Sequence, residues 1–426
     1  MATSHMSHGL SAIVLGAVLA ISPAASADLT WTEPIEVASG GGHKGPWRMN
    51  ASEFHYVDDP TVAINEKGLI GVAFADLLRH DIYFQAVSPS GSRLLEQAVN
   101  VSNSPKIFSW LPRVVISDDE PLKVYVLWQE IVFSGGSHGG EIFFARSGDG
   151  GKSFTRPVNL SNSLPGDGKG RLTQRYWDNG SLDLVADASG ALYAAWTEYE
   201  GTLWLRKSAD GGKSFSAPLR INDERSGPAR GPALAAGADG IVYLAWAVGE
   251  DPAADIHLAK SDDGGRSFSS PRVVHDTEGH SDAPKLRVDG EGTVHLVYAE
   301  SPAGPFKRYH IRYARSSDKG KTFESPRDIS DPESEVFYSV NFPALGIDGQ
   351  EHVYVMFELF PEQGQRSRGL GLTYSSNGGR TFSPPAMVPG SADEHGGING
   401  SLQGLLMRKL AVNAAGDIAV VNSTFI

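Results

Sequence analysis

The stretch Ser147-Gly-Asp-Gly-Gly-Lys-Ser-Phe154, followed by Pro157, decides the fold of this chain because it recurs. The pattern Ser-x-Asp-x-Gly-x-Ser/Thr-Phe, with a proline three residues after the phenylalanine, occurs four times, and a fifth copy has Asn377 in place of the aspartate. Successive copies are 53 to 61 residues apart and begin at Ser147, Ser208, Ser261, Ser316 and Ser375. A period of this length is typical of repeat arrays and propellers.

Each copy lies between two short segments that have the character of strands. One example is the alternating run Asp255-Ile-His-Leu-Ala-Lys260, which precedes the third copy and predicts a half-buried strand. Serine and aspartate side chains bond the amides of a turn, glycine accepts a positive φ, and an aromatic ring anchors the turn in the core. The repeated motif therefore predicts a hairpin turn, and its aspartates are predicted to be structural rather than catalytic.

A second repeated unit precedes each hairpin and consists of an apolar strand, a polar turn with glycine, and another strand. Pro232-Ala-Leu with Ile241 to Trp246 is one example, and the seven copies lie at Pro60, Pro112, Ser181, Pro232, Pro284, Pro343 and Lys409. Two strands from this unit and two from the hairpin make a four-stranded antiparallel blade. We predict an all-β, seven-bladed β-propeller, with six blades as the alternative.

The ends of the chain are predicted to meet in the last blade. The segment Trp31-Thr-Glu-Pro34-Ile35 matches the strand that follows every hairpin, although no hairpin precedes it in the sequence. We expect it to be the outer strand of the last blade, because closing the ring removes exposed sheet edges.

Composition limits the classes of function. The 426 residues carry a net charge of −13, which argues against a basic nucleic-acid-binding surface. The chain has no cysteine, so disulfides, a thiolate nucleophile and cysteine-ligated zinc are excluded. The histidines lack the spacing of HxH or HExxH, and we predict neither a metal nor a cofactor.

Residues 1–27 are predicted not to belong to the fold. Met1 to His5 resembles an expression scar, and Leu10 to Ile21 is an apolar run of the length of a signal peptide, too short to span a bilayer. Ala25-Ser-Ala27 fits a cleavage site. We therefore expect a periplasmic or secreted protein with one domain, residues 28–426, and no membrane span in the mature chain.

The repeated turns are similar to Asp boxes, and the chain from Asp28 to Ile426 resembles the sialidase-like propeller superfamily of bacterial neuraminidases and BNR-repeat proteins. In this family the Asp boxes lie on the face opposite the active site. The resemblance implies a site of three arginines for the carboxylate of sialic acid, a tyrosine nucleophile activated by a glutamate, and an aspartate as acid/base.

Some of these positions match the family and others do not. Arg308 and Tyr338 follow the family's order and spacing, whereas Asp58 stands where the first arginine would lie. Ala247-Val248 replaces the second arginine, and the glutamate expected near Gly231 is missing. For a glycosidase we predict Tyr338 as nucleophile or transition-state stabiliser and Asp58 as acid/base.

The loops that enter the inner strands contain the other candidate residues. Rings and charged groups on one concave surface suit a sugar. The predicted substrate-binding residues are Arg308, Arg230, Arg113, Arg175, Tyr176, Trp177, His55, His280 and Asp282. The leading hypothesis is an exported glycoside hydrolase that acts on an acidic glycan. A tyrosine or histidine base with an arginine would instead support a uronate polysaccharide lyase, and a non-catalytic glycan- or protein-binding propeller is the third alternative.

Overall fold

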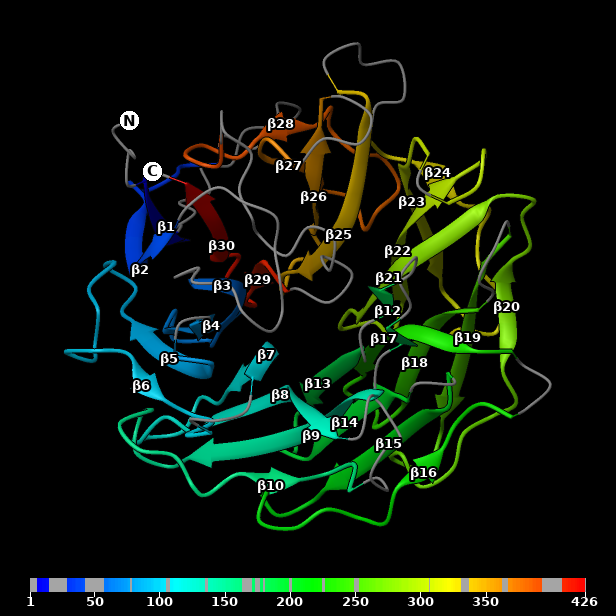
Figure 1. Cartoon of the computed structure of the whole chain (residues 1–426). Helices are drawn as coiled ribbons and strands as arrows, with labels where there is room; N and C mark the ends of the chain where they lie inside the picture. The colour runs from blue at the N-terminus through cyan, green and yellow to red at the C-terminus, as the bar shows by residue number, and fades with distance from the viewer. Residues whose placement is uncertain are drawn as a thin grey trace.

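The protein is described from a computed structural model. The structure describes residues 6–14, 29–42, 57–76, 79–104, 108–134, 137–162, 171–172, 177–178, 181–198, 201–223, 227–248, 253–305, 307–330, 337–361, 367–392 and 408–425. In these ranges the chain forms β-strands joined by turns, arranged around a central axis (Figure 1). No helix of the described residues has the length and apolar character needed to cross a membrane.

Six four-stranded antiparallel blades consist of consecutive strands, each in the order of the sequence. Blades one and two contain β3 (Val57–Ile64), β4 (Ile70–Asp76), β5 (Asp81–Val87) and β6 (Val99–Asn100), then β7 (Phe108–Ile116), β8 (Val124–Ser134), β9 (Ser137–Ser147) and β10 (Val158–Asn159). Blades three and four contain β13 (Leu182–Ala186), β14 (Leu192–Thr197), β15 (Leu203–Ser208) and β16 (Leu219–Arg220), then β17 (Ala229–Ala236), β18 (Val242–Val248), β19 (Asp255–Ser261) and β20 (Arg272–His275). Blades five and six contain β21 (His280–Val288), β22 (Val294–Ser301), β23 (His310–Ser316) and β24 (Arg327–Asp328), then β25 (Ser339–Ile347), β26 (Val353–Phe360), β27 (Leu370–Ser375) and β28 (Ala386–Met387).

A further four-stranded sheet combines both ends of the chain in the order β2-β1-β30-β29. Its strands are β1 (Met6–Val14), β2 (Ile35–Gly42), β29 (Leu410–Val412) and β30 (Ile418–Phe425). The predicted N-terminal outer strand is thus present as β2, which begins at Ile35. Strand β1, between β2 and β30, comes from the residues that the sequence assigns to an expression scar and signal peptide.

The structure confirms an all-β propeller of four-stranded antiparallel blades. Six blades of consecutive strands are present, which is the number of the alternative prediction. The preferred count of seven is not confirmed. The additional sheet has four strands only with β1, and processing of the chain before Asp28 would remove that strand.

The inner strands share a bulge that the repeated prolines mark. In β3, β7, β17, β21 and β25 the pairing with the next strand shifts at this proline. The residue before each proline has a positive φ between 52° and 59°, and these residues are Asp59, Leu111, Gly231, Ala283 and Phe342. A bulge re-aims the side chains beside it. The residues just before these bulges therefore occupy equivalent positions at one end of the blades.

The repeated turns at the opposite end join neighbouring blades. In each turn the serine Oγ accepts a hydrogen bond from the amide of the glycine four residues later, at 2.7–2.9 Å. Three turn phenylalanines pack edge-on against an aromatic ring of the preceding blade: Phe154 on Phe84, Phe215 on Phe144 and Phe382 on Tyr313, with ring centroids 5.7, 5.0 and 4.8 Å apart. The motif thus fixes the turn and also the contact between blades.

Candidate functional site

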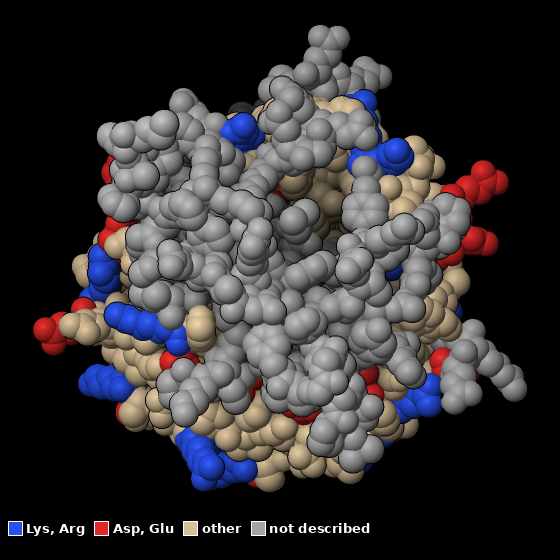
Figure 2. All heavy atoms as spheres, in the orientation of Figure 1, with Lys and Arg blue, Asp and Glu red and all other residues tan. Residues whose placement is uncertain are grey.

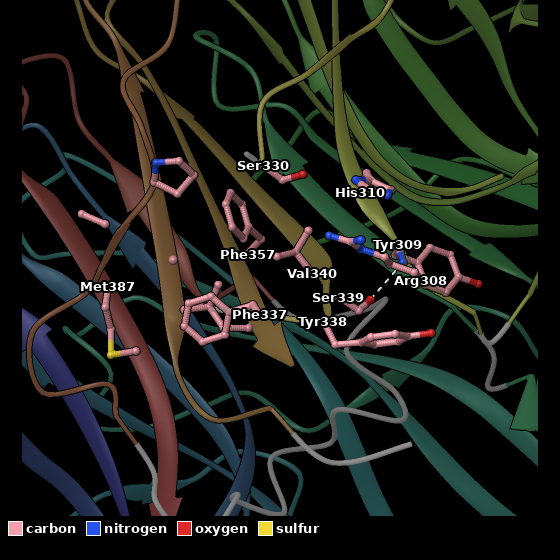
Figure 3. A pocket seen from close by; sticks show the side chains of 14 residues that line it. Arg308, Tyr309, His310, Ser330, Phe337, Tyr338, Ser339, Val340, Phe357 and Met387 are labelled. Atoms are coloured by element: carbon pink, nitrogen blue, oxygen red, sulfur yellow. Dashed lines mark hydrogen bonds between the residues drawn. The ribbon is translucent and has the colours of Figure 1, made fainter. Parts of the chain in front are cut away.

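A cavity of about 240 Å³ lies between blades five and six, where Arg308 and Tyr338 come together. One wall is polar and the other is apolar (Figure 3). The surface view also shows a hollow in the upper right of this face (Figure 2). Residues of both blades line the cavity: Arg308, Tyr309, His310, Ser330, Phe337, Tyr338, Ser339, Val340, Phe357, Leu359, Gly371, Pro385, Ala386 and Met387.

Two backbone segments form the polar wall and are bonded to each other. The amide of Tyr309, just before β23, donates to Ser339 Oγ at 2.9 Å, the bond dashed in Figure 3. The amide of Val340 in turn donates to the carbonyl oxygen of Tyr309 at 3.2 Å. Because these bonds join adjacent blades, they bring Arg308 and Tyr338 to one wall although 30 residues separate them in the sequence.

His310 contributes a histidine–carboxylate pair to this wall. Its Nδ1 lies 3.0 Å from Asp328 Oδ2, on the outer strand of the same blade. Burial raises the pKa of Asp328, but hydrogen bonds from His310 and Ser330 outweigh burial and hold the pKa below its usual value. Since a charged carboxylate fixes the ring orientation through Nδ1, Nε2 is the nitrogen left for proton transfer.

The opposite wall is apolar and belongs mainly to blade six. Phe357 is fully buried and Leu359 nearly so, whereas Met387 on the outer strand is 43% exposed. Phe337 and Val340 complete this wall. An apolar surface facing hydrogen-bonding groups suits a ring with one apolar face and polar substituents, such as a sugar.

A second polar group lies at the start of the inner strands of blades four and five. Arg230 Nε is 3.5 Å from Asp282 Oδ1, and Arg230 Nη2 is 3.2 Å from His280 Nε2. Burial raises the pKa of Asp282, but Arg230 and His280 lower it more strongly, to about 2. The ring of His280 packs edge-on against Tyr309 at 6.2 Å, so this group adjoins the cavity through Tyr309.

The structure distributes the predicted site residues over three places. Arg308 and Tyr338 line the cavity, and Arg230, His280 and Asp282 form the neighbouring group. Arg113 lies deeper: only 2% of it is exposed, and its Nε is 3.6 Å from Asp183 Oδ1. Contact between Arg113 and a ligand therefore requires access through the centre of the ring.

The remaining predicted residues lie wholly or partly outside the described residues. Asp58 is placed in β3, opposite Ala75, but its side chain is not described. Trp177 belongs to the short strand β12 (Trp177–Asp178), which pairs with β11 (Arg171–Leu172), and its side chain is likewise outside the described part. His55, Arg175 and Tyr176 lie outside the described residues altogether.

Sequence reasoning missed several residues of the cavity, above all Tyr309, His310 and Asp328. Tyr309 and His310 directly follow Arg308, so the run of three polar or aromatic residues at the start of a strand was an available signal. No signal in the sequence indicated Asp328 or the apolar wall, because they lie on outer and middle strands whose place beside Arg308 depends on the packing of blades.

In the described part of the chain, no group of three or more histidine or acidic side chains could hold a metal ion.

Comparisons with known proteins bear on the fold. No protein-family model matches the chain, and no curated protein matches it in sequence. Among solved structures, an ulvan lyase, a polysaccharide lyase bound to GlcA(1-4)Rha3S units, is similar with 13% identity and a TM-score of 0.52 over 78% of this chain and 85% of the lyase. A protein of unknown function from Dyadobacter fermentans has 15% identity and a TM-score of 0.50 over 76% of this chain and 97% of that protein. A Hadza microbial sialidase has 14% identity and a TM-score of 0.47 over 79% of this chain and 66% of the sialidase. At these identities the likeness to the first two structures establishes a shared propeller fold.

Proposed function

We propose that this protein binds an acidic glycan in the cavity between blades five and six and cleaves it. The observation that carries the proposal is that Arg308, His310 and Tyr338 line one cavity opposite an apolar wall. A guanidinium binds a sugar carboxylate through charge-assisted hydrogen bonds. The fold shared with a lyase that was solved with a bound acidic saccharide supports a glycan as the ligand.

The lining favours β-elimination of a uronate. Among the described residues that line the cavity there are an arginine, a histidine and tyrosines but no carboxylate. Arg308 neutralises the uronate carboxylate, which makes the C5 proton more acidic, and His310 Nε2 accepts that proton. The C4–O bond breaks as the double bond between C4 and C5 forms, and the hydroxyl of Tyr338 donates its proton to the departing oxygen. Asp328 keeps the imidazole oriented.

Hydrolysis is the second candidate, because Arg308 and Tyr338 share the cavity as the resemblance to sialidases implies. In this reaction Tyr338 is the nucleophile. Asp58, just before the bulge of β3, is the proposed acid/base. A propeller that binds the glycan without cleaving it remains the third candidate.

One assay separates the three candidates. The purified chain is incubated with a panel of uronate polysaccharides and with an unhindered α-sialoside. Elimination produces an unsaturated uronate that absorbs in the ultraviolet, whereas hydrolysis releases a reducing sugar or sialic acid without that absorbance. Binding alone raises the melting temperature without product.

Four variants test the place of the reaction. Arg308→Ala and Tyr338→Phe are expected to abolish product formation. Arg266→Ala, an exposed arginine in a repeated turn, and Tyr374→Phe, at the end of β27, are the matched controls and are expected to retain it. Full activity of both cavity variants would exclude this cavity as the site.

We also infer that the ring closes with a seventh blade. The contacts of β29 with the inner strands β25 and β3 on either side support closure.

We infer further that the chain is exported. The apolar run Leu10 to Ile21 supports export. N-terminal sequencing of the protein from an expressing cell tests export, which predicts a mature start near Asp28. A full-length chain in the cytoplasm would contradict it.

A further inference from the structure

Each of the six blades places an aromatic ring of its second strand in the core against a neighbouring sheet. In blades one to four, the residue paired with it on the third strand is a ring too, and three of these pairs have ring centroids 6.1 Å apart. The pairs are Phe74–Tyr83, Trp128–Phe143, Trp196–Trp204 and Trp246–His257. Two rings on one face of a blade thus fill the gap towards its neighbour.

Blades five and six depart from this pattern. In blade five the ring of Tyr298 pairs with Arg312, whose side chain is still long. In blade six Phe357 pairs with Gly371, which has no side chain. Gly371 in turn pairs with Met387 on the outer strand. Blade six therefore lacks a side chain at the register position where the other five blades all have a large one.

The cavity between blades five and six lies at this position. Phe357, Gly371 and Met387 are the successive members of this layer in blade six, and all three line the cavity. Phe357 and Met387 lie on the left in Figure 3, apart from Arg308 and Tyr338 on the right. The blade that lacks the side chain is thus the blade that supplies the apolar wall.

The backbone at Gly371 does not require glycine. Its φ lies outside the left-handed region, and its strand pairs with both neighbours without a shift in register. A glycine inside a regular strand often marks a place where a ligand or another group approaches closely. The ends of Phe357 and Leu359 lie 2.9 Å from where a Cβ would be. A side chain at this position would therefore push them, or extend itself, into the cavity.

The size of the cavity limits what it can hold. Its volume of about 240 Å³ lies just below the range of about 300–1,000 Å³ that is usual for ligand pockets. The space suits one ring of a glycan rather than several.

We propose that Gly371 is the specificity-determining residue of this cavity, because its missing side chain leaves space for one sugar ring beside Phe357 and Met387. The sugar takes the place that side-chain rings have in blades one to four. Its C–H face lies against the apolar wall, and its polar groups face Arg308 and Tyr338. This inference rests on the proposed function, since it places a ring of the same glycan in the same cavity.

The first test compares glycan cleavage by Gly371→Ala and by Gly71→Ala. Gly371→Ala is expected to lower kcat/KM about 10²-fold, because the side-chain ends that it displaces misplace the sugar ring. Gly71, in β4, is the matched control: a Cβ there would lie 2.8 Å from Ile116 and 3.0 Å from Phe84, which is similar crowding away from the cavity. Gly71→Ala should lower the melting temperature by a similar amount and keep the rate of the natural chain. Equal rates in the two variants would overturn the proposal.

The second test does not depend on cleavage. Cyclohexanecarboxylate is a ring with apolar faces and one carboxylate, and saturation-transfer NMR follows its binding. The natural chain and Gly71→Ala are expected to bind it, whereas Gly371→Phe, which supplies the missing ring, should show no binding at the same concentration. Should Gly371→Phe fail to fold, Gly371→Ala takes its place and should bind more weakly than Gly71→Ala.

The two tests separate the failure of this inference from that of the proposed function. Binding of the probe that is lost in the Gly371 variant, with no cleavage of any glycan by the natural chain, would refute the function and support the role of Gly371. Cleavage by the natural chain that persists at full rate in the Gly371 variant would refute the role of Gly371 alone. Absence of probe binding to the natural chain would also count against that role.

Discussion

The two ends of the blades differ in how their side chains are organised. At the end with the repeated turns, the same serine, acidic or amide residue, and glycine make the same bonds in five places, and Asn377 reproduces the contacts of the aspartates. At the other end, the residues before the inner-strand bulges differ from blade to blade. The repeated end is built within short segments and holds the ring together, whereas the varied end forms the candidate cavity from residues that two neighbouring blades bring together.

This comparison predicts that substitutions at the two ends separate stability from activity. The largest expected effect is on activity. His310→Gln should lower the rate of glycan cleavage by about 10²- to 10⁴-fold, because it removes the proposed base, while the melting temperature changes little. Rates and melting curves of the purified variant check this.

The matched control for His310 lies at the repeated end. His352 makes a similar pair, with Nδ1 2.7 Å from Asp348 Oδ2, in the connection between β25 and β26. His352→Gln should leave the rate unchanged. If both histidine variants lose activity alike, the division between the two ends is wrong.

The next effect is on stability at the repeated end. Gly379 has a φ of +76°, and a Cβ there would lie 1.7 Å from the hydroxyl of Tyr313. Gly379→Ala should lower the free energy of unfolding by about 2–4 kcal/mol, from backbone strain and steric overlap. Gly378→Ala, where φ is a similar +65° but the atom nearest to an added Cβ lies 3.6 Å away, an ordinary contact distance, should cost about 1–2 kcal/mol. Denaturant unfolding measures both, and equal losses would show that the contact between blades contributes little.

A pH-dependent effect is expected at the varied end. Burial raises the pKa of Asp59 from 3.8 to about 6, so the folded state favours its neutral form. The stability that this form provides is complete below about pH 4 and is lost as the pH rises through 6, a cost of about 3 kcal/mol. Asp59→Asn keeps an acceptor for the amide of Leu111 and should be more stable than the natural chain at pH 8 but not at pH 4. A less stable variant at pH 8 would mean that the ionised form of Asp59 supports the fold.

The smallest expected effect is that of a chelator. Since the described residues contain no cluster suited to a metal, and the proposed reaction uses only side chains, chelation should change neither the melting temperature nor the cleavage rate. Loss of activity that zinc or calcium restores would contradict this prediction.

The accuracy of the sequence-based predictions follows the same division. The turns were predictable because their bonds join residues two to four positions apart, so each copy contains all the information it needs. Arg308 and Tyr338 were found through resemblance to a family rather than through local chemistry. His310 and Asp328 were missed because their pairing crosses from one strand of a blade to another, and nothing in the spacing of the two residues indicates it.

The sequence by itself determined the blade: its turns, its proline-marked bulges and its alternation of strands follow from local hydrogen bonding and backbone geometry. Only the tertiary structure decided which blades meet at the cavity, and that Asp183 comes to lie beside Arg113 and Arg408 at the axis of the ring. The physical reason is that a repeat specifies contacts along the chain with nearly identical residues. A site instead depends on the few residues that differ, and on the neighbours that closing a ring gives them.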